Sequence, residues 1–231
     1  MIEAIALTKR YNGHTALDDL HLSVPAGETF CLLGQNGAGK TTTINLFLGF
    51  LKATSGKAFI NGKEVNPDDA ETRQHIAYIP EVVMLYSYLT SIENLDFFSR
   101  IAGYKYSRQQ LETFLIRAGL QPNAFHKPVG NHSKGMRQKV GIAIALAKNA
   151  GVIFMDEPTS GLDPKATSEF NEIVQSLSRQ GKAIFMATHD IFNAVTIATR
   201  IGIMKQGKLV HIIEARSINA EDLQKLYLET I

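Results

Sequence analysis

The residues GQNGAGKT, at positions 34–41, restrict the fold of this chain more than any other stretch. They fit the pattern G-x-x-x-x-G-K-[ST], they directly follow the apolar segment TFCLL, and they open a segment with helical periodicity. Glycines at this spacing let successive backbone N–H groups turn toward a phosphate, and the start of the helix adds the positive end of its dipole. The motif therefore predicts a strand, a phosphate-binding loop and a helix within an α/β fold.

Two polar side chains of this phosphate loop have an expected task. Lys40 is expected to reach the β- and γ-phosphates of a nucleotide, and the hydroxyl of Thr41 to ligate Mg²⁺. The residues expected to bind the nucleotide are Asn36, Gly37, Ala38, Gly39, Lys40, Thr41 and Thr42. The alternative is a glycine-rich turn without a ligand, which the strand–turn–helix context disfavours.

A second polar cluster follows the apolar run of VIFMDEP. The run predicts a buried strand that ends at Asp156, which we expect to hold Mg²⁺ through water. Glu157 comes next, and two adjacent acids at a buried strand end are costly unless a metal or a proton transfer uses them. We therefore assign Glu157 as the base that polarises an attacking water. An exposed surface pair is the alternative.

The rest of the chain alternates between strand-like and helical stretches. Strands are expected at 2–7, 20–24, 29–34, 57–65, 152–156, 183–188, 201–204 and 209–213, with Asn61-Gly62 as a hairpin turn. Helices are expected at 40 to about 51, after the capping boxes of Thr90 with Glu93 and Ser107 with Gln110, after Asp163-Pro164, and at 219–231. Gly119 is expected to end the second capped helix. This order predicts an α/β core with an antiparallel β part before it and a helical insertion.

Composition excludes several classes of protein. A net charge of +2 over 231 residues argues against general coating of nucleic acid. The single cysteine, Cys31, cannot form an internal disulfide, and we expect it to be buried in a protein of a reducing compartment. The first residues lack the order of a secretory signal, and no apolar stretch approaches the roughly 20 residues that span a bilayer. We therefore expect a soluble protein.

These motifs together resemble the nucleotide-binding domain of the ATP-binding cassette (ABC) family over essentially the whole chain. GQNGAGKTT resembles its Walker A motif and VIFMDEP its Walker B motif with the catalytic glutamate. The resemblance implies a D-loop at Ser160, Gly161, Leu162 and Asp163. It also implies a switch histidine at His189 in ATHD, which would contact the γ-phosphate and orient the transition state, and an adenine-stacking aromatic at Tyr11. The alternatives are a core histidine at 189 and a plain strand-end aromatic at 11. It implies the ABC ATPase fold, a P-loop (RecA-like) core with a mainly parallel sheet. The N-terminal antiparallel β subdomain and this core would together cover approximately 1–81 and 150–231, and the inserted helical subdomain approximately 82–149.

The stretch NHSKGMRQK, at 131–139, has three readings on its own: a nucleic-acid patch, an ordinary helix start, or an anion site at a helix end. Ser133 is a good N-cap, and an apolar face of Met136, Val140, Ile144 and Ala147 follows it, which favours the anion site. The resemblance aligns 132–136 with the family signature Leu-Ser-Gly-Gly-Gln. It implies that Ser133, Lys134, Gly135 and Met136 act in trans, on ATP held by a second subunit.

Two positions depart from the family pattern. Glu81 stands where the family has a glutamine that ligates Mg²⁺ and reports to the membrane partner, so the resemblance implies Glu81 as a Mg²⁺ ligand. A carboxylate can still ligate Mg²⁺ but cannot donate an amide hydrogen bond, and a solvent-facing loop glutamate is the alternative. Lys134 replaces the first signature glycine, and it either adds a cation toward the phosphate or points to solvent. Around it, His132 is expected to pack or cap, and Arg137 and Lys139 to form a solvated helix face.

The resemblance implies the ATPase subunit of an ABC transporter, of the subgroup that serves ABC-2-type exporters, with ATP and Mg²⁺ as cofactors. The expected partners are a second nucleotide-binding subunit, as a homodimer around two ATP, and a separate transmembrane permease that holds the protein at the inner face of the cell membrane. No nucleic-acid partner is expected. The alternatives are a soluble ABC-type ATPase acting on nucleic acid or ribosomes, and a P-loop kinase or GTPase, which leaves the signature stretch and Glu157 unexplained.

Overall fold

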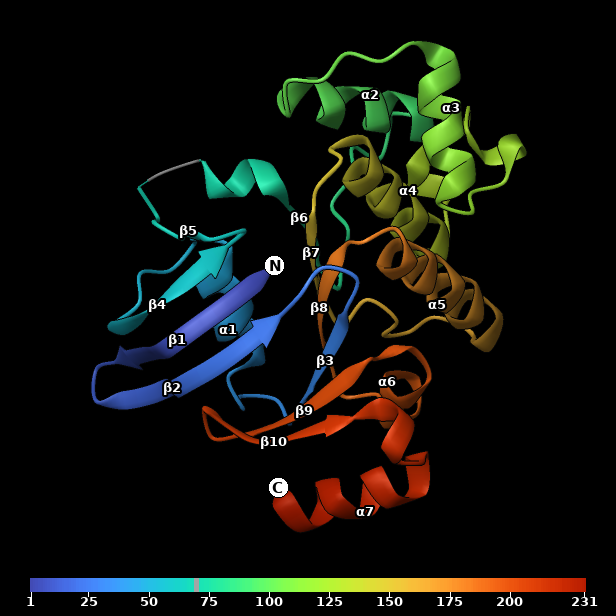
Figure 1. Cartoon of the computed structure of the whole chain (residues 1–231). Coiled ribbons are helices and arrows are strands. Elements are labelled where there is room, and N and C mark those ends of the chain that lie inside the picture. Colours follow the sequence, from blue (N-terminus) through green and yellow to red (C-terminus); the bar gives the residue numbers. More distant parts are fainter. Residues whose placement is uncertain (69–70) are drawn as a thin grey trace.

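Two β-sheets and seven α-helices form the part of the chain that the computed structural model describes, residues 1–68 and 71–231 (Figure 1). One sheet has the strand order β2-β1-β4-β5, and the other has the order β10-β9-β3-β8-β7-β6. The expected α/β fold, with an antiparallel part and a mainly parallel core, is confirmed. The chain order places the antiparallel strands at the N-terminal end, on either side of the phosphate loop.

The smaller sheet is antiparallel. Its strands are β1 (Ile2–Tyr11), β2 (His14–Val24), β4 (Ser55–Ile60) and β5 (Lys63–Glu64). The turn between β4 and β5 is the predicted Asn61-Gly62, and both residues have positive φ, 51° and 79°. A two-residue turn with this backbone matches the twist of paired strands, so the hairpin prediction is confirmed.

The larger sheet carries the core of the molecule. Its strands are β3 (Thr29–Leu33), β6 (Ile76–Ile79), β7 (Val152–Asp156), β8 (Ala183–Thr188), β9 (Arg200–Lys205) and β10 (Lys208–Glu214). Only β10 runs antiparallel to its neighbour. All residues of β3, β7 and β8 are buried, as expected for central parallel strands covered on both faces. Cys31 is among them, so its predicted burial is confirmed.

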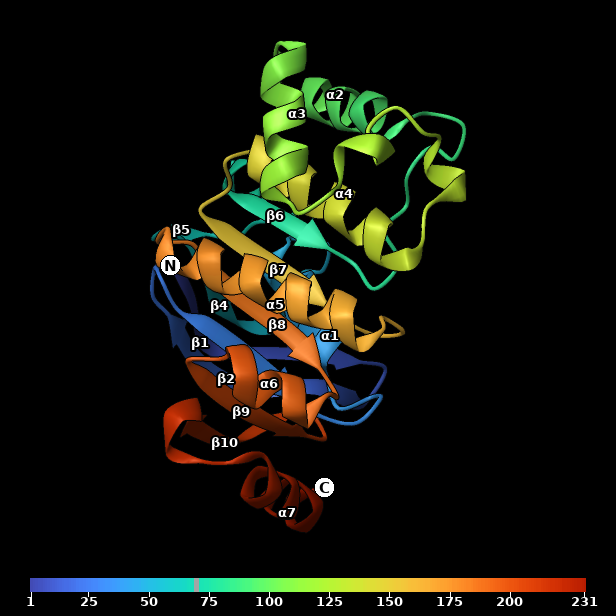
Figure 2. The same ribbon diagram turned by 90° about the vertical axis from the view of Figure 1, so that its right-hand side faces the viewer.

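The helices divide between the sheet and one end of the molecule. They are α1 (Lys40–Phe47), α2 (Ser91–Ile101), α3 (Arg108–Arg117), α4 (Lys134–Ala147), α5 (Pro164–Arg179), α6 (Ile191–Ile197) and α7 (Ala220–Thr230). Helices α2, α3 and α4 lie together beyond the edge strand β6, while α5 and α6 cover one face of the sheet (Figure 2). Both predicted capping boxes are present, and Gly119 follows α3 with φ of +76°.

Three local expectations differ from the structure. The helix after the phosphate loop ends at Phe47 rather than near Leu51, because the chain turns at Gly49 with φ of +68°. Strand β6 and helix α6 were not anticipated, since four and seven residues are too short to show a clear period. On α2, the helical spacing of Ile92, Leu95, Phe98 and Ile101 predicts one apolar face, but Ile101 is 68% exposed.

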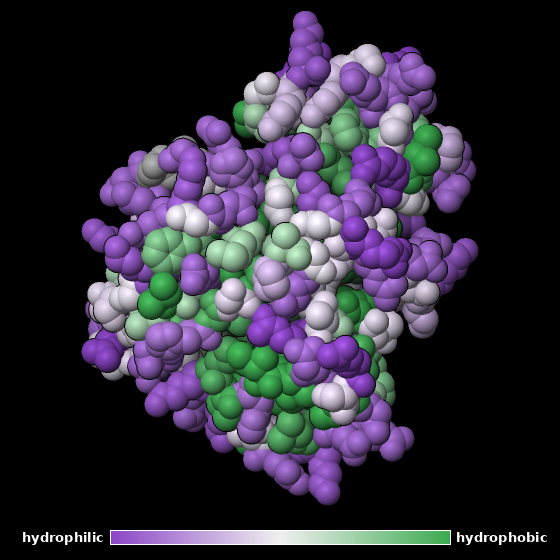
Figure 3. All heavy atoms as spheres, in the orientation of Figure 1, coloured by the Kyte–Doolittle hydropathy of each residue, from purple (hydrophilic) through white to green (hydrophobic). Residues whose placement is uncertain are grey.

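Two apolar clusters flank the larger sheet. One joins it to α4, α5 and α6, and the other joins it to α1 and the antiparallel sheet. Some apolar side chains stay at the surface: Figure 3 shows them gathered low on one face, in the region of β10 and α7, where Val210, Ile212 and Leu228 are exposed. Among the helices of the described residues, none has the length and apolarity needed to cross a bilayer.

Candidate functional site

The phosphate loop connects β3 to α1 and is held in shape by its glycines. Gly37 and Gly39 have φ of +83° and +113°, a region that side chains with a Cβ rarely adopt. A Cβ at Gly39 would lie 2.5 Å from the carbonyl oxygen of Ala16, and one at Gly34 would lie 2.8 Å from that of Met204. The close approach of β2 and β9 to the loop therefore requires glycine at both positions.

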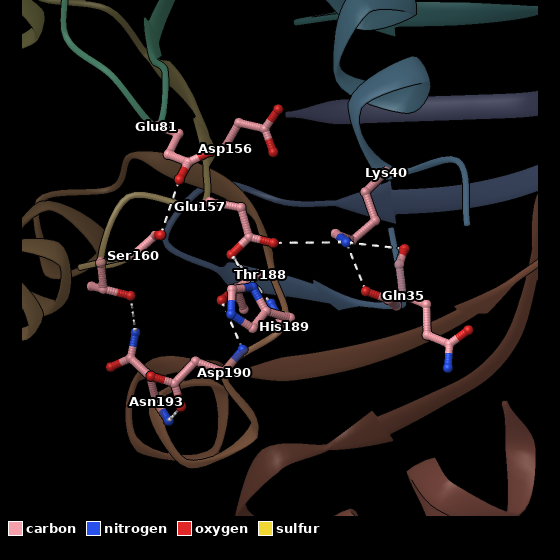
Figure 4. Close-up of polar contacts among 12 residues, drawn as sticks. Gln35, Lys40, Glu81, Asp156, Glu157, Ser160, Thr188, His189, Asp190 and Asn193 are labelled. Carbon is pink, nitrogen blue, oxygen red and sulfur yellow. Dashed lines mark hydrogen bonds and ion pairs between the residues drawn. The ribbon is translucent and has the colours of Figure 1, made fainter. Parts of the chain in front are cut away.

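Lys40 begins α1 and folds back over the loop. Its side chain is 7% exposed, and Nζ donates hydrogen bonds to the carbonyl oxygens of Gly34 at 2.6 Å and Gln35 at 3.3 Å. Nζ also lies 3.7 Å from Oε1 of Glu157 (Figure 4). A buried cation that is held by its own loop is a preorganised counter-charge for an anion in that loop.

The end of β7 brings a carboxylate to the start of α1. The Oγ1 atom of Thr41 donates a hydrogen bond of 2.9 Å to Oδ2 of Asp156. Burial raises the pKa of Asp156, and the nearby charges of Glu157 and Glu81 raise it further, while the hydrogen bond from Thr41 opposes the shift. The positive charge of Lys40 opposes it as well, so a cation bound beside Asp156 would stabilise the charged carboxylate further.

Glu157 follows β7 in a strained conformation and points into the same site. Its φ is +46°, which is unusual for a residue with a side chain, and its N–H donates to the carbonyl oxygen of Ala187 at the end of β8. Its Oε2 atom lies 2.8 Å from Nδ1 of His189 and accepts a longer hydrogen bond from the N–H of His189 (Figure 4). Such strain persists where the surroundings over-determine a functional geometry.

These groups line one cavity of about 360 Å³. Its lining residues are Ala16, Gln35, Asn36, Gly37, Gly39, Lys40, Thr41, Thr42, Glu81, Asp156 and Glu157. Most of the predicted nucleotide residues are here, while Ala38 lines the neighbouring cavity on the other side of the loop. Ala16 and Gln35 were not singled out from the sequence. Tyr11 is not part of this lining: it is 40% exposed at the end of β1, with Nζ of Lys9 4.8 Å from its ring centroid.

The side chains of this cavity can bind Mg²⁺ only together with the phosphates of a bound nucleotide. Within the described residues, no group of three or more His, Cys, Asp or Glu side chains is placed to hold a metal ion by itself. Mg²⁺ typically takes one or two carboxylates, several waters and substrate phosphates. The hydroxyl of Thr41 and the carboxylate of Asp156 fit that pattern.

The signature stretch and the predicted D-loop pack against each other beside the cavity. Ser133 caps α4 by accepting a hydrogen bond from the N–H of Met136 at 3.2 Å, so the predicted N-cap is confirmed. Gly135 lies against α5 and the loop before it, because a Cβ there would contact Ala166 at 3.4 Å and Leu162 at 3.6 Å. Asp163 caps α5 with an acceptor oxygen 2.9 Å from the N–H of Ala166.

Glu81 and Lys134, the two residues that depart from the family pattern, lie close together at this junction. Nζ of Lys134 lies 3.9 Å from Oε1 of Glu81, and Oγ of Ser160 donates to the same oxygen at 3.0 Å (Figure 4 for Glu81 and Ser160). The side chain of Lys134 is 31% exposed. In this structure it faces a carboxylate of its own chain, which neither of the two sequence-based alternatives described.

Other side chains of the stretch have structural partners. His132 is buried, with Nε2 2.7 Å from Oγ of Ser91, in agreement with a packing role. The expectation of a solvated Lys139 is wrong: its side chain is 15% exposed and Nζ lies 2.5 Å from Oε2 of Glu169 on α5. Gln138 was missed, because its burial is visible only in the structure; its Nε2 donates to the carbonyl oxygen of Pro158 at 2.9 Å.

Comparisons with known proteins agree with this geometry. A family model described as "ABC transporter" matches residues 17–160. An uncharacterised ABC transporter ATP-binding protein of Synechocystis sp. is 39% identical over 84% of this chain and 55% of its own length. The bacitracin transport ATP-binding protein BcrA of Bacillus licheniformis is 36% identical over 92% of this chain and 69% of its own length. The chain thus spans little more than half of the first relative.

Solved structures are similar over nearly the whole chain. The ATP-binding cassette MJ0796, in a dimeric post-hydrolysis state bound to ADP and Pi, matches with a TM-score of 0.84 and 27% identity, over 94% of this chain and all of that one. The cassette cbiO1 of Clostridium perfringens, part of a transporter complex, matches with a TM-score of 0.85 and 26% identity, over 98% of this chain and 94% of that one.

Proposed function

The chain belongs to the ABC transporter family, and we propose that it is the ATP-hydrolysing subunit of an ABC-2-type exporter. The observation that carries the proposal is the cavity in which Lys40, Glu157 and the phosphate loop converge. Relatives named as ATP-binding proteins of transporters support it, and a dimeric cassette bound to ADP and Pi supports hydrolysis of ATP. None of these observations favours action on nucleic acid or ribosomes.

The residues of the cavity have complementary tasks in this proposal. The N–H groups of the phosphate loop and the start of α1 bind the triphosphate, and Lys40 neutralises its terminal charge. Thr41 and Asp156 would hold Mg²⁺, which would supply further charge neutralisation at the phosphates. Glu157 accepts the proton of the attacking water, and His189 orients the carboxylate of Glu157. Catalysis of this kind is mainly positioning and electrostatic stabilisation.

We infer that the start of α4 completes the nucleotide site of a second subunit. Ser133 caps this helix of 14 residues, and Lys134, Gly135 and Met136 form its first turn, at an N-terminus that favours an anion. We infer a homodimer around two ATP, in which each α4 faces the phosphates held by the other subunit. Ser160, Gly161, Leu162 and Asp163 connect the two halves, and Tyr11 stacks on adenine.

A separate transmembrane subunit is the second partner that we propose. A cavity of about 900 Å³ lies between β6 and the helices α2 and α4, and exposed apolar side chains such as Phe50 and Ile101 border it. We infer that residues 82–149 act as a helical subdomain that passes motion to this partner near Glu81. The chain then works at the inner face of the cell membrane.

Substitution of the base tests the proposal. Glu157→Gln keeps the size of the side chain but removes its charge, so we expect ATP to bind, dimer to accumulate and turnover to fall by about 10²-fold or more. Turnover is measured as phosphate release and dimerisation by light scattering. Glu221→Gln, on exposed α7, is the matched control. Near-normal turnover of Glu157→Gln would overturn the assignment.

A further inference from the structure

Two side chains that depart from the family pattern are far apart in the sequence but lie close together in the fold. Glu81 follows strand β6, and Lys134 is the first residue of α4. Their charged atoms lie 3.9 Å apart, and Ser160 fixes the same carboxylate oxygen with a hydrogen bond of 3.0 Å. A glutamate where glutamine is usual is thus accompanied by a lysine where glycine is usual.

The glutamate alone adds charge of the wrong sign to a nucleotide site. Glu81 lines the cavity together with Asp156 and Glu157, and Lys40 is the cation among the residues of that lining. A triphosphate brings further negative charge to the same place. An uncompensated third carboxylate would weaken its binding by repulsion, which solvent moderates because the side chain of Glu81 is 52% exposed.

We propose that Lys134 is a positioning residue that neutralises Glu81 and holds its carboxylate at the edge of the cavity, away from the triphosphate. The inference rests on the proposed function of the site. It identifies Glu81 and Lys134 as one functional unit, so that a glutamate is tolerated at this position because the lysine is present.

The surroundings of Lys134 favour this intramolecular role over contact with a phosphate of the second subunit. Its Nζ lies over the D-loop, since a Cβ on Gly161 would be 3.7 Å from it. Gly161 has φ of +68° and no side chain, which leaves room for the lysine. The pair therefore connects the segment after β6, the D-loop and the start of α4 within one subunit.

A double-mutant cycle tests the pair. Lys134→Gln, Glu81→Gln and the double variant are compared with the wild-type chain for equilibrium binding of a non-hydrolysable ATP analogue with Mg²⁺. We expect Lys134→Gln to weaken binding by about fivefold or more, and the double variant to return to within about twofold of wild type. Lys134→Arg keeps the charge and should bind normally. Lys225→Gln, at an exposed position of α7, controls for loss of one positive charge.

The coupling should also decrease with added salt, because the side chains of the pair are partly exposed. Equal weakening by Lys134→Gln with either residue at position 81 would mean that the lysine acts on the nucleotide directly, and it would overturn the inference. Unchanged binding in all variants would overturn it as well. A wild-type chain that binds no nucleotide would overturn the proposed function itself, whereas binding without coupling removes this inference alone. Denaturant unfolding of each variant without nucleotide identifies any loss that comes from misfolding.

Discussion

Nδ1 of His189 lies 2.8 Å from Oε2 of Glu157, and Nζ of Lys40 lies 3.7 Å from the other oxygen of the same carboxylate. The carboxylate is therefore held from two sides, by the end of β8 and by the start of α1. A base that is oriented before substrate arrives needs no reorganisation during the reaction.

Removal of the imidazole should slow turnover without abolishing nucleotide binding. In His189→Ala, Glu157 loses one of its two orienting partners, while the phosphate loop and Lys40 are unchanged. We expect kcat to fall by about 10²-fold and the dissociation constant of ATP to change little. Steady-state kinetics and equilibrium binding measure the two quantities, with the exposed His14→Ala as control. A large loss of binding with normal kcat would contradict the orienting role.

The glycines of the phosphate loop give a paired test of packing. Gly37 and Gly39 both have positive φ, so alanine is strained at either position, but only at Gly39 would the Cβ lie 2.5 Å from Ala16 O. At Gly37 it would meet nothing within 4 Å. We expect Gly39→Ala to lower the free energy of unfolding by about 2 kcal/mol more than Gly37→Ala. Denaturant unfolding without nucleotide checks this, and equal losses would argue against a close approach of β2.

The start of α4 can be blocked without loss of the subunit's own nucleotide site. Ser133→Arg places a bulky cation where the second subunit is proposed to approach, so ATP should still bind while ATP-driven dimerisation and hydrolysis are lost. Ser107→Arg removes the N-cap of α3 in the same way, and it controls for the cost of the lost cap, about 1 kcal/mol. Sedimentation with and without ATP measures dimerisation. Intact dimerisation of Ser133→Arg would show that this helix end is not in the interface.

Local rules in the sequence were sufficient for the phosphate loop, the capping boxes and the Asn61-Gly62 turn, because each depends on residues that are close together in the chain. The contacts that were missed depend on packing between distant segments. Lys139 meets Glu169 because α4 lies beside α5, and Lys134 meets Glu81 because β6 ends beside the start of α4. A sequence pattern gives the helix on which such a residue lies, but not the partner of its side chain.

Helix α2 and the signature stretch are joined by a buried histidine that should make stability depend on pH. His132 is 5% exposed, and burial is the main cause that lowers its pKa from 6.5; the charges of Arg137 and Lys127 add to this, and a hydrogen bond with the backbone of Ala124 opposes it. Oγ of Ser91 donates its one proton to the carbonyl oxygen of Ala124, so we infer that Nε2 of His132 donates to Ser91.

Because the folded pKa is depressed, the unfolded chain binds a proton below pH 6.5 while the folded chain does not. The free energy of unfolding should therefore fall as pH decreases through 6.5, and this contribution should level off below the folded pKa. The largest slope from one such group is about 1.4 kcal/mol per pH unit. His132→Gln keeps a donor for Ser91 and should remove this part of the slope, whereas exposed His14→Gln should not. Chemical denaturation at several pH values makes the comparison, and an unchanged slope in His132→Gln would mean that the buried imidazole is not the titrating group.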